Sequence, residues 1–439
     1  MLILFIFLAL VVMICLNVPI AVALAISAII GLVATEGTGS IPTRRSSDLG
    51  TGSIVSAALD MYDGSTKFSL IAIPMFVLAG AIMNAGGVTD KLINFVSAII
   101  GFVKGGLSMV TIGVSLFFAE ISGSAVADVA AIGSVLIPQM KKRGYGAPLA
   151  AAVTSSSASL AIIIPPSIPM ILYATSSNTS VEQLFVAGII PGLMGAAGLM
   201  FVAYCFARKY DLPVEEAFNV KRLRETFIDA LPAFTLPFII LGGIFGGFVT
   251  ATEAAGLAVL AALLVGLWYR QIDFKHLKSA MLDGGMQTAI VMLLVAASVV
   301  MGGFLTRAQL PQELAAGMLE ITTNKWLILL MLNFFFLIIG FFLHSAAAII
   351  LVVPIVIPLI AAVGIDPIHF GLVVTLNLAI GQQTPPVASV LITACAVARA
   401  NIWEVSKINI YFIAVLFVVL MICTYVPSIP MFLVEYFYR

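Results

Sequence analysis

Residues 154–170 read TSSSASLAIIIPPSIPM, in which hydroxyl side chains and an apolar run precede a Pro-Pro pair. Residues 375–386 read TLNLAIGQQTPP and follow the same order, with two amides before a second Pro-Pro pair. Because proline interrupts a helix, each segment predicts an apolar helix that is broken at its prolines. Unwound backbone at membrane depth is tolerated only around a cavity, so paired broken helices indicate a transporter binding site. Proline kinks that serve packing alone are the alternative.

The composition places the chain in a lipid bilayer. Of 439 residues, 62% are hydrophobic and 10% are charged, and the mean hydropathy is +1.16. A soluble domain carries about 25% charged residues. A spanning helix needs about 20 apolar residues, which leaves room for roughly ten passes. Lys and Arg together number 21, as do Asp and Glu, so no electrostatic basis exists for a nucleic-acid partner. We expect an all-α polytopic membrane protein.

The two broken segments belong to a longer internal repeat at an offset of 220 residues. This offset aligns Pro138, Gly144, Pro165 and Pro166 with Pro358, Gly364, Pro385 and Pro386. Each copy contains an apolar segment, a small polar cluster, an apolar return, a glycine turn and the broken helix. The polar clusters read ISGSA at 121–125 and LHSA at 343–346. Each cluster therefore predicts the tip of a re-entrant hairpin.

Basic residues orient the repeat in the membrane, because short loops rich in Lys and Arg favour the cytoplasmic side. The basic clusters occupy 141–143, 208–224, 270–278 and 399–407. If all four clusters are cytoplasmic, the chain must cross the membrane an even number of times between any two of them. This requirement makes the first hairpin open toward the cytoplasm and the second open toward the outside. We therefore predict two inverted repeats, 1–206 and 231–439, joined by an amphipathic connector over 207–230.

One polar stretch fits neither repeat. The pentapeptide GTGSI occurs at 37–41 and again at 50–54, on both sides of PTRRSSDL at 42–49. This octapeptide matches one translation of the end of a common sequencing adapter. We therefore interpret region 36–54 as containing an adapter-derived scar at 42–49 and exclude it from the topology. A natural polar loop is the alternative.

Asp128 is the main candidate for ion coupling. A charge at bilayer depth costs at least about 2.5 kcal/mol, so an acidic residue there is a functional hypothesis. Ser124 precedes Asp128 by four residues and shares its helical face. With Ser122, these side chains offer hard oxygen ligands suited to Na⁺ or H⁺ coupling. A structural hydrogen-bond cluster is the alternative.

Further polar groups lie near both Pro-Pro pairs, where we expect unwound backbone. Ser156 and Ser157 belong to the hydroxyl run of the first half, and we assign them to solute binding. The matching groups of the second half are His344, Ser345, Asn377, Gln382, Gln383 and Thr384. Two adjacent amides cannot both point into one neighbouring helix, so Gln382 and Gln383 favour solute contact over contact between helices. For His344, a hydrogen-bonded packing role stands beside solute binding as an equal alternative.

Sequence motifs of enzymes are missing from the chain. It contains no HExxH, GxSxG, Walker A or GxGxxG pattern, which argues against metalloprotease, hydrolase and nucleotide chemistry. Without a P-loop, uphill transport must draw on an ion gradient or on another subunit. We expect no enzyme activity and no cofactor.

Six segments in order resemble the large membrane subunit of TRAP (tripartite ATP-independent periplasmic) transporters. They are 72–80, 121–128, 164–170, 252–255, 364–371 and 377–386. The resemblance implies an elevator mechanism driven by Na⁺ in the bacterial inner membrane, with a small organic acid as solute. It also implies two partners, a small four-helix membrane subunit and a periplasmic substrate-binding protein. Two alternative transport functions are a stand-alone ion-coupled carrier or exchanger and a passive channel.

The resemblance also assigns residues to sites. The first sodium site would use Ser122, Ser124 and Asp128 with the hydroxyl of Ser155, and the second would use the second tip. Ser345, Thr384 and Pro385 are the residues that we carry over to that second ion site. The solute contacts that we assign from the residues themselves are Ser156, Ser157, His344, Asn377, Gln382 and Gln383. Many relatives have an acidic residue where this chain has His344, which leaves the charge of the second site and the coupling stoichiometry open.

Overall fold

The computed structural model describes residues 2–16, 18–36, 53–215, 217–385 and 387–438. These residues form helices and connections with no strand among them, which confirms the all-α expectation. Eight of the described helices are long and apolar enough to cross a membrane. The suspected scar at 42–49 lies outside the described residues.

The first half of the chain forms the following elements. They are α1 (Leu2–Cys15), α2 (Ile20–Glu36), α3 (Ser53–Ser65), η1 (Phe68–Ile71), α4 (Ala72–Ala85), α5 (Val88–Ile100), α6 (Gly106–Ser122), α7 (Ala125–Lys142), α8 (Ala147–Ala158), η2 (Ser159–Ile162), α9 (Ile168–Ser177) and α10 (Val181–Lys209).

The second half continues from the connector. Its elements are α11 (Val220–Pro237), η3 (Phe238–Gly242), α12 (Gly243–Phe245), α13 (Ala251–Trp268), α14 (Phe274–Arg307), α15 (Leu310–Ile321), α16 (Lys325–Phe342), α17 (Ser345–Ala362), α18 (Pro367–Gly381), α19 (Ser389–Ala398), α20 (Ile402–Tyr425) and α21 (Ser428–Tyr438).

Helix boundaries repeat at the offset seen in the sequence. Helices α7 and α17 begin and end 220 positions apart, and α8 and α18 begin 220 positions apart. Gly144 and Gly364, which follow α7 and α17, both adopt left-handed backbone with φ of 87° and 67°. Glycine suits this region because it has no Cβ. The direction of each repeat relative to the membrane stays a prediction.

Both Pro-Pro segments are broken as expected. In the first, α8 passes into the short helix η2, and α9 begins at Ile168 beyond the prolines. In the second, α18 ends at Gly381 and α19 begins at Ser389. Each broken helix therefore consists of two short helical pieces whose inner ends face an unwound segment.

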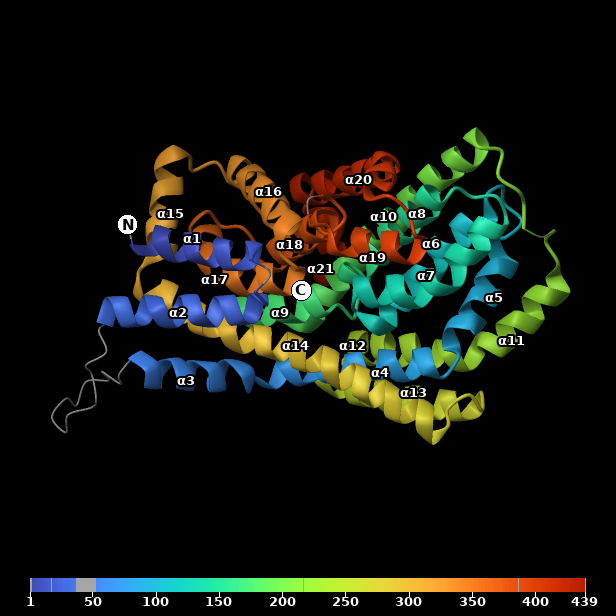
Figure 1. Cartoon of the computed structure of the whole chain (residues 1–439), viewed down its shortest axis with the longest axis horizontal. Coiled ribbons are helices and arrows are strands. Elements are labelled where there is room, and N and C mark those ends of the chain that lie inside the picture. Colours follow the sequence, from blue (N-terminus) through green and yellow to red (C-terminus); the bar gives the residue numbers. More distant parts are fainter. Residues whose placement is uncertain (1, 17, 37–52, 216, 386, 439) are drawn as a thin grey trace.

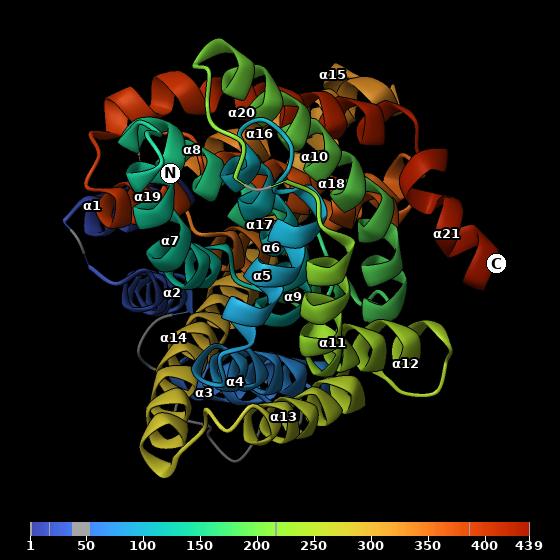
Figure 2. The same cartoon turned by 90° about the vertical axis from the view of Figure 1, so that its right-hand side faces the viewer.

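The hairpins and broken helices occupy the middle of the bundle. Figure 2 shows α6, α17 and α18 between α20 on one side and α4, α13 and α14 on the other. Helix α14 packs against α2, α3, α4 and α17, while α20 packs against α8, α10 and α18. The α10–α11 connection and α15 lie at opposite ends of the long axis (Figure 1).

The amphipathic connector expected over 207–230 includes the end of α10 and the beginning of α11. Helix α11 begins at Val220, because the Asn219 side chain accepts hydrogen bonds from the backbone N–H groups of Lys221 and Arg222 and so caps the helix. A candidate span then runs without interruption from Val220 to Phe245. The boundary expected at residue 230 thus falls inside a helix.

Candidate functional site

The tip of the first hairpin touches the first Pro-Pro break. Helix α6 ends at Ser122, and Gly123 turns the chain with a left-handed φ of 59° before α7 begins. A Cβ atom on Gly123 would lie 2.9 Å from the backbone oxygen of Pro166. Glycine is therefore required both by the backbone angle and by the close approach.

The tip of the second hairpin contacts the second broken helix in a comparable way. The backbone N–H of Val387 donates to the Phe341 carbonyl at 3.2 Å. Gly340, which precedes Phe341, lies close to α18, because a Cβ atom on Gly381 would lie 2.6 Å from the Cα of Gly340. Two glycines thus let α16 and α18 approach with their backbones in contact.

Both tips and both breaks line one small cavity of about 50 Å³. Ser124 from the first tip, His344 and Ser345 from the second, and Gln382 from the second break all lie on its wall. Four residues predicted from the two halves of the sequence therefore meet at one place.

Three helices begin at this cavity. Residues at the N-termini of α7, α9 and α17 line it, with Ser124, Ser167 and His344 as the respective N-caps. The first backbone N–H groups of a helix have no partner within the helix, and its N-terminus carries about half a positive charge. The described cavity wall contains no Lys or Arg. The cavity therefore gathers the positive ends of three helix dipoles without a cationic side chain on its described wall.

Gln382 lines this cavity and carries a buried side-chain amide. Its side chain is 1% exposed, and its Oε1 accepts from the Ser389 hydroxyl at 3.3 Å. Its Nε2 has no partner in the described part of the chain. A buried donor without an acceptor costs about 1–3 kcal/mol, so an acceptor on a bound solute would relieve this cost.

Asp128 lies one turn behind the first tip rather than on the cavity wall. It is fully buried on α7, and its backbone N–H donates to the Ser124 carbonyl at 3.0 Å. Ser155 on α8 is also fully buried, and its hydroxyl has no hydrogen-bond partner among the described residues. The side chain of Ser122 lies outside the described part of the structure.

Three predicted solute residues lie in buried polar networks away from the cavity wall. The hydroxyl of Ser156 donates to Asn409 Oδ1 at 2.6 Å, and that of Ser157 accepts from Ser115 at 2.9 Å. Asn377 Nδ2 donates to Asn333 Oδ1 at 2.7 Å. These contacts join α8 to α20 and α6, and α18 to α16.

The remaining predicted residues lie at the second break. Gln383 is buried, and its Nε2 donates to the Ala379 carbonyl at 3.2 Å. The Thr384 hydroxyl donates to the Ile380 carbonyl at 3.0 Å, and Pro385 is half-buried. Gln383, Thr384 and Pro385 all lie outside the cavity wall.

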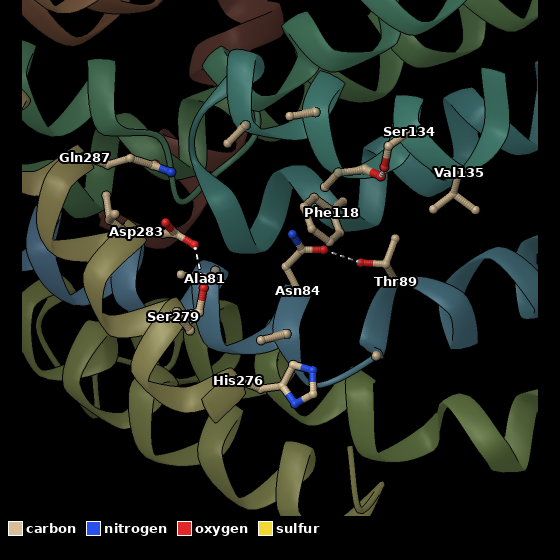
Figure 3. Close-up of a pocket in the computed structure, with 18 of the residues that line it drawn as sticks. Ala81, Asn84, Thr89, Phe118, Ser134, Val135, His276, Ser279, Asp283 and Gln287 are labelled. Carbon is tan, nitrogen blue, oxygen red and sulfur yellow. Dashed lines mark hydrogen bonds between the residues drawn. The ribbon is translucent and has the colours of Figure 1, made fainter. Parts of the chain in front are cut away.

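A larger vestibule of about 630 Å³ adjoins the cavity (Figure 3). Helices α4, α7 and α14 form its wall, and Val77 and Gln287 line both spaces. Helix α14 contributes a polar stripe of residues spaced three or four apart, which places them on one helical face. The stripe comprises His276, Ser279, Asp283 and Gln287. Figure 3 shows Gln287 at one end of this stripe and His276 at the other.

Sequence reasoning did not select this stripe. The signal was present as four polar residues at helical spacing within a 34-residue helix that is otherwise largely apolar. The packing of α14 against α4 and α17 could not be read from spacing alone.

The fold and cavity define a polytopic transport protein, and comparison with known proteins names its family. The family described as "Tripartite ATP-independent periplasmic transporter, DctM component" matches residues 7–429. The chain belongs to this family. It is a transporter permease subunit rather than an enzyme, and a multi-pass protein of the bacterial inner membrane.

Similar proteins include three named permeases. The isethionate TRAP transporter permease DctMQ of Oleidesulfovibrio alaskensis is 38% identical over 95% of this chain, which spans 64% of that protein. The C4-dicarboxylate permease DctM of Pseudomonas aeruginosa is 35% identical over 86% of this chain and 89% of its own length. The sialic acid permease SiaM of Vibrio cholerae is 35% identical over 95% of both chains.

A solved structure shares the fold. The crystal structure of the Alcanivorax borkumensis YdaH transporter, described as having an unusual topology, superposes with a TM-score of 0.63 at 15% identity. The match covers 92% of this chain and 96% of that chain.

Proposed function

We propose that this protein is the large permease subunit of a sodium-coupled secondary transporter that imports a small organic anion. The observation that carries the proposal is the cavity where three helix N-termini meet beside the Nε2 of Gln382, with no Lys or Arg on its described wall. Each of these groups is a hydrogen-bond donor or a positive partial charge. The relatives named for isethionate, C4-dicarboxylate and sialic acid also handle organic acids.

In this proposal, bound Na⁺ supplies the positive charge that the cavity wall lacks for balancing an anionic solute. The buried carboxylate of Asp128 lies one helical turn from Ser124, and both can provide oxygen ligands beside the first tip. Ser122 and Ser155 complete the proposed first ion site, and Ser345, Thr384 and Pro385 form the second. Hard cations prefer oxygen ligands of these kinds.

An elevator movement would carry the cavity across the membrane. The hairpins α6–α7 and α16–α17 and the two broken helices would move together against α4, α13 and α14. A small four-helix membrane subunit and a periplasmic binding protein would complete the transporter. Membership of the family supports both partners, because its members act in three-component systems.

Thermal unfolding of the purified permease in NaCl and in choline chloride of equal ionic strength tests the sodium site. A ligand at 100 times its Kd adds about 2.7 kcal/mol to the free energy of unfolding, so Na⁺ should raise the Tm. Asp128→Asn should remove this shift, while Asp63→Asn, an exposed acid on α3, should keep it. An equal Na⁺ shift in Asp128→Asn contradicts this ion site.

Uptake by proteoliposomes tests the transport mode. With both partner proteins present, an inward Na⁺ gradient should accumulate the solute above its external concentration. Equilibration without accumulation contradicts coupling and indicates a passive channel. Full uptake without the partners indicates a stand-alone carrier.

A further inference from the structure

The small cavity cannot enclose a whole organic acid. Its volume is about 50 Å³, and on the same scale one water molecule needs about 10–15 Å³, so the space holds about three to five groups of the size of a water molecule. The cavity therefore accepts a single acidic group. The rest of a bound solute must extend past Val77 and Gln287, which line both the cavity and the vestibule.

The vestibule wall beside this opening is polar and acidic. Asp283 precedes Gln287 by four residues on α14, about 6 Å along the helix axis. The hydroxyl of Ser279 donates to Asp283 Oδ2 at 3.4 Å, and Asn84 on α4 faces the same space (Figure 3). The described vestibule residues include two carboxylates, Asp90 and Asp283, and no Lys or Arg. This wall accepts hydrogen bonds and repels a second negative charge.

We propose that the solute is a monoanion with a hydroxyl-bearing neutral tail, and that Gln287 and Asp283 select this tail where the cavity opens into the vestibule. This inference rests on the proposed function, because it takes the cavity as the site of the acidic group. Gln287 contacts the tail directly through its amide, and Asp283 accepts a hydroxyl hydrogen bond while excluding dianions.

The size of the discrimination follows from electrostatics and hydrogen bonding. Two like charges 4 Å apart in water repel by an energy equivalent to about a fivefold change in affinity. A monoanion should therefore bind at least about fivefold more tightly than a dianion of the same carbon number. Gln287→Leu should weaken hydroxylated monoanions by about fivefold, because the hydrogen bond between its exposed amide and the hydroxyl of the tail is lost.

The test uses the intact purified permease in NaCl and measures apparent Kd from the dependence of Tm on ligand concentration. Two matched pairs serve as probes, 4-hydroxybutyrate with succinate and gluconate with glucarate. The monoanion of each pair should bind more tightly. Asp283→Asn should remove this preference, whereas Asp283→Glu, which keeps the charge, should retain it. Glu225→Gln on the exposed surface of α11 is the control for the loss of any acidic residue.

The possible failures are distinguishable. Dianions that bind as tightly as monoanions, or a preference that survives in Asp283→Asn, overturn this inference and leave the anion transporter in place. No stabilisation by any of the four anions overturns the proposed anion site together with the inference.

Discussion

Ser124 and His344 are 220 positions apart, and each occupies the N-cap position of the helix that follows its hairpin tip on the wall of one cavity. The two positions are equivalent in the repeat but differ in chemistry, since one offers a hydroxyl and the other an imidazole. The Nδ1 of His344 accepts from the backbone N–H of Ala346 at 3.4 Å. The cavity is therefore symmetric in backbone and asymmetric in side chains.

Replacement of His344 tests its capping role. His344→Ala should lower the free energy of unfolding by about 1 kcal/mol, because the N-terminus of α17 loses its side-chain acceptor. His344→Asn keeps an acceptor that suits an N-cap and should unfold near the wild-type temperature. Equal losses in both variants would show that the imidazole acts through other contacts.

Gly123→Ala should destabilise the first tip and abolish transport. An alanine at φ 59° costs about 1–2 kcal/mol, and its Cβ would also press on the Pro166 oxygen. Gly144→Ala is the matched control, because Gly144 also has positive φ but nothing lies within 4 Å of its Cβ position. Thermal unfolding and uptake should show a larger defect for Gly123. Equal defects in the two variants would show that the contact between Gly123 and Pro166 does not contribute to stability or transport.

Gly381→Ala should be destabilising even though alanine normally favours helices by about 1 kcal/mol over glycine. Its Cβ would lie within 3.0 Å of the backbone of Gly340, so α16 and α18 would have to separate. Gly317→Ala on α15, where no atom lies within 4 Å, should instead be neutral or stabilising. Chemical or thermal unfolding of both variants measures the difference. A stabilised Gly381→Ala protein would contradict the observed close approach.

Gln382→Met should change stability and binding in opposite directions. Removal of the buried Nε2 donor should raise the free energy of unfolding by up to about 1 kcal/mol, while solute affinity should fall because the donor is lost. Gln383→Met is the comparison, since Gln383 is equally buried but lies off the cavity wall, and its replacement should leave solute affinity unchanged. Unchanged solute affinity in Gln382→Met would exclude this amide from the binding site.

The sequence predicted the hairpins and breaks well because proline and glycine determine them locally. Gly144, Gly364 and the Pro-Pro pairs act on the backbone around them, so their spacing alone places α7, α8, α17 and α18. The cavity was predictable to the extent that its polar groups lie at those tips and breaks, as Ser124, His344, Ser345 and Gln382 do.

The environment of the other candidate site residues is determined by neighbours that are distant in the chain, so it could not be predicted from local sequence. Ser156 and Asn377 are hydrogen-bonded to Asn409 and Asn333, and these partners belong to helices that spacing does not bring together. Gln287 was not predicted as a site residue. It lines the cavity only because α14 passes the two hairpin tips, and this packing cannot be read from the sequence. The ion-site roles of Asp128 and Ser155 stay predictions.

The matching helix boundaries in the two halves restrict how this protein can evolve. Each inserted residue would rotate the following part of a helix by about 100°. A single insertion inside α7 or α8, or inside α17 or α18, would therefore turn the tip away from the break it touches. The solute can therefore change by substitution at the cavity wall, whereas insertions and deletions fit only outside these four helices, for example in the turns at Gly144 and Gly364, where a Cβ would meet no atom within 4 Å.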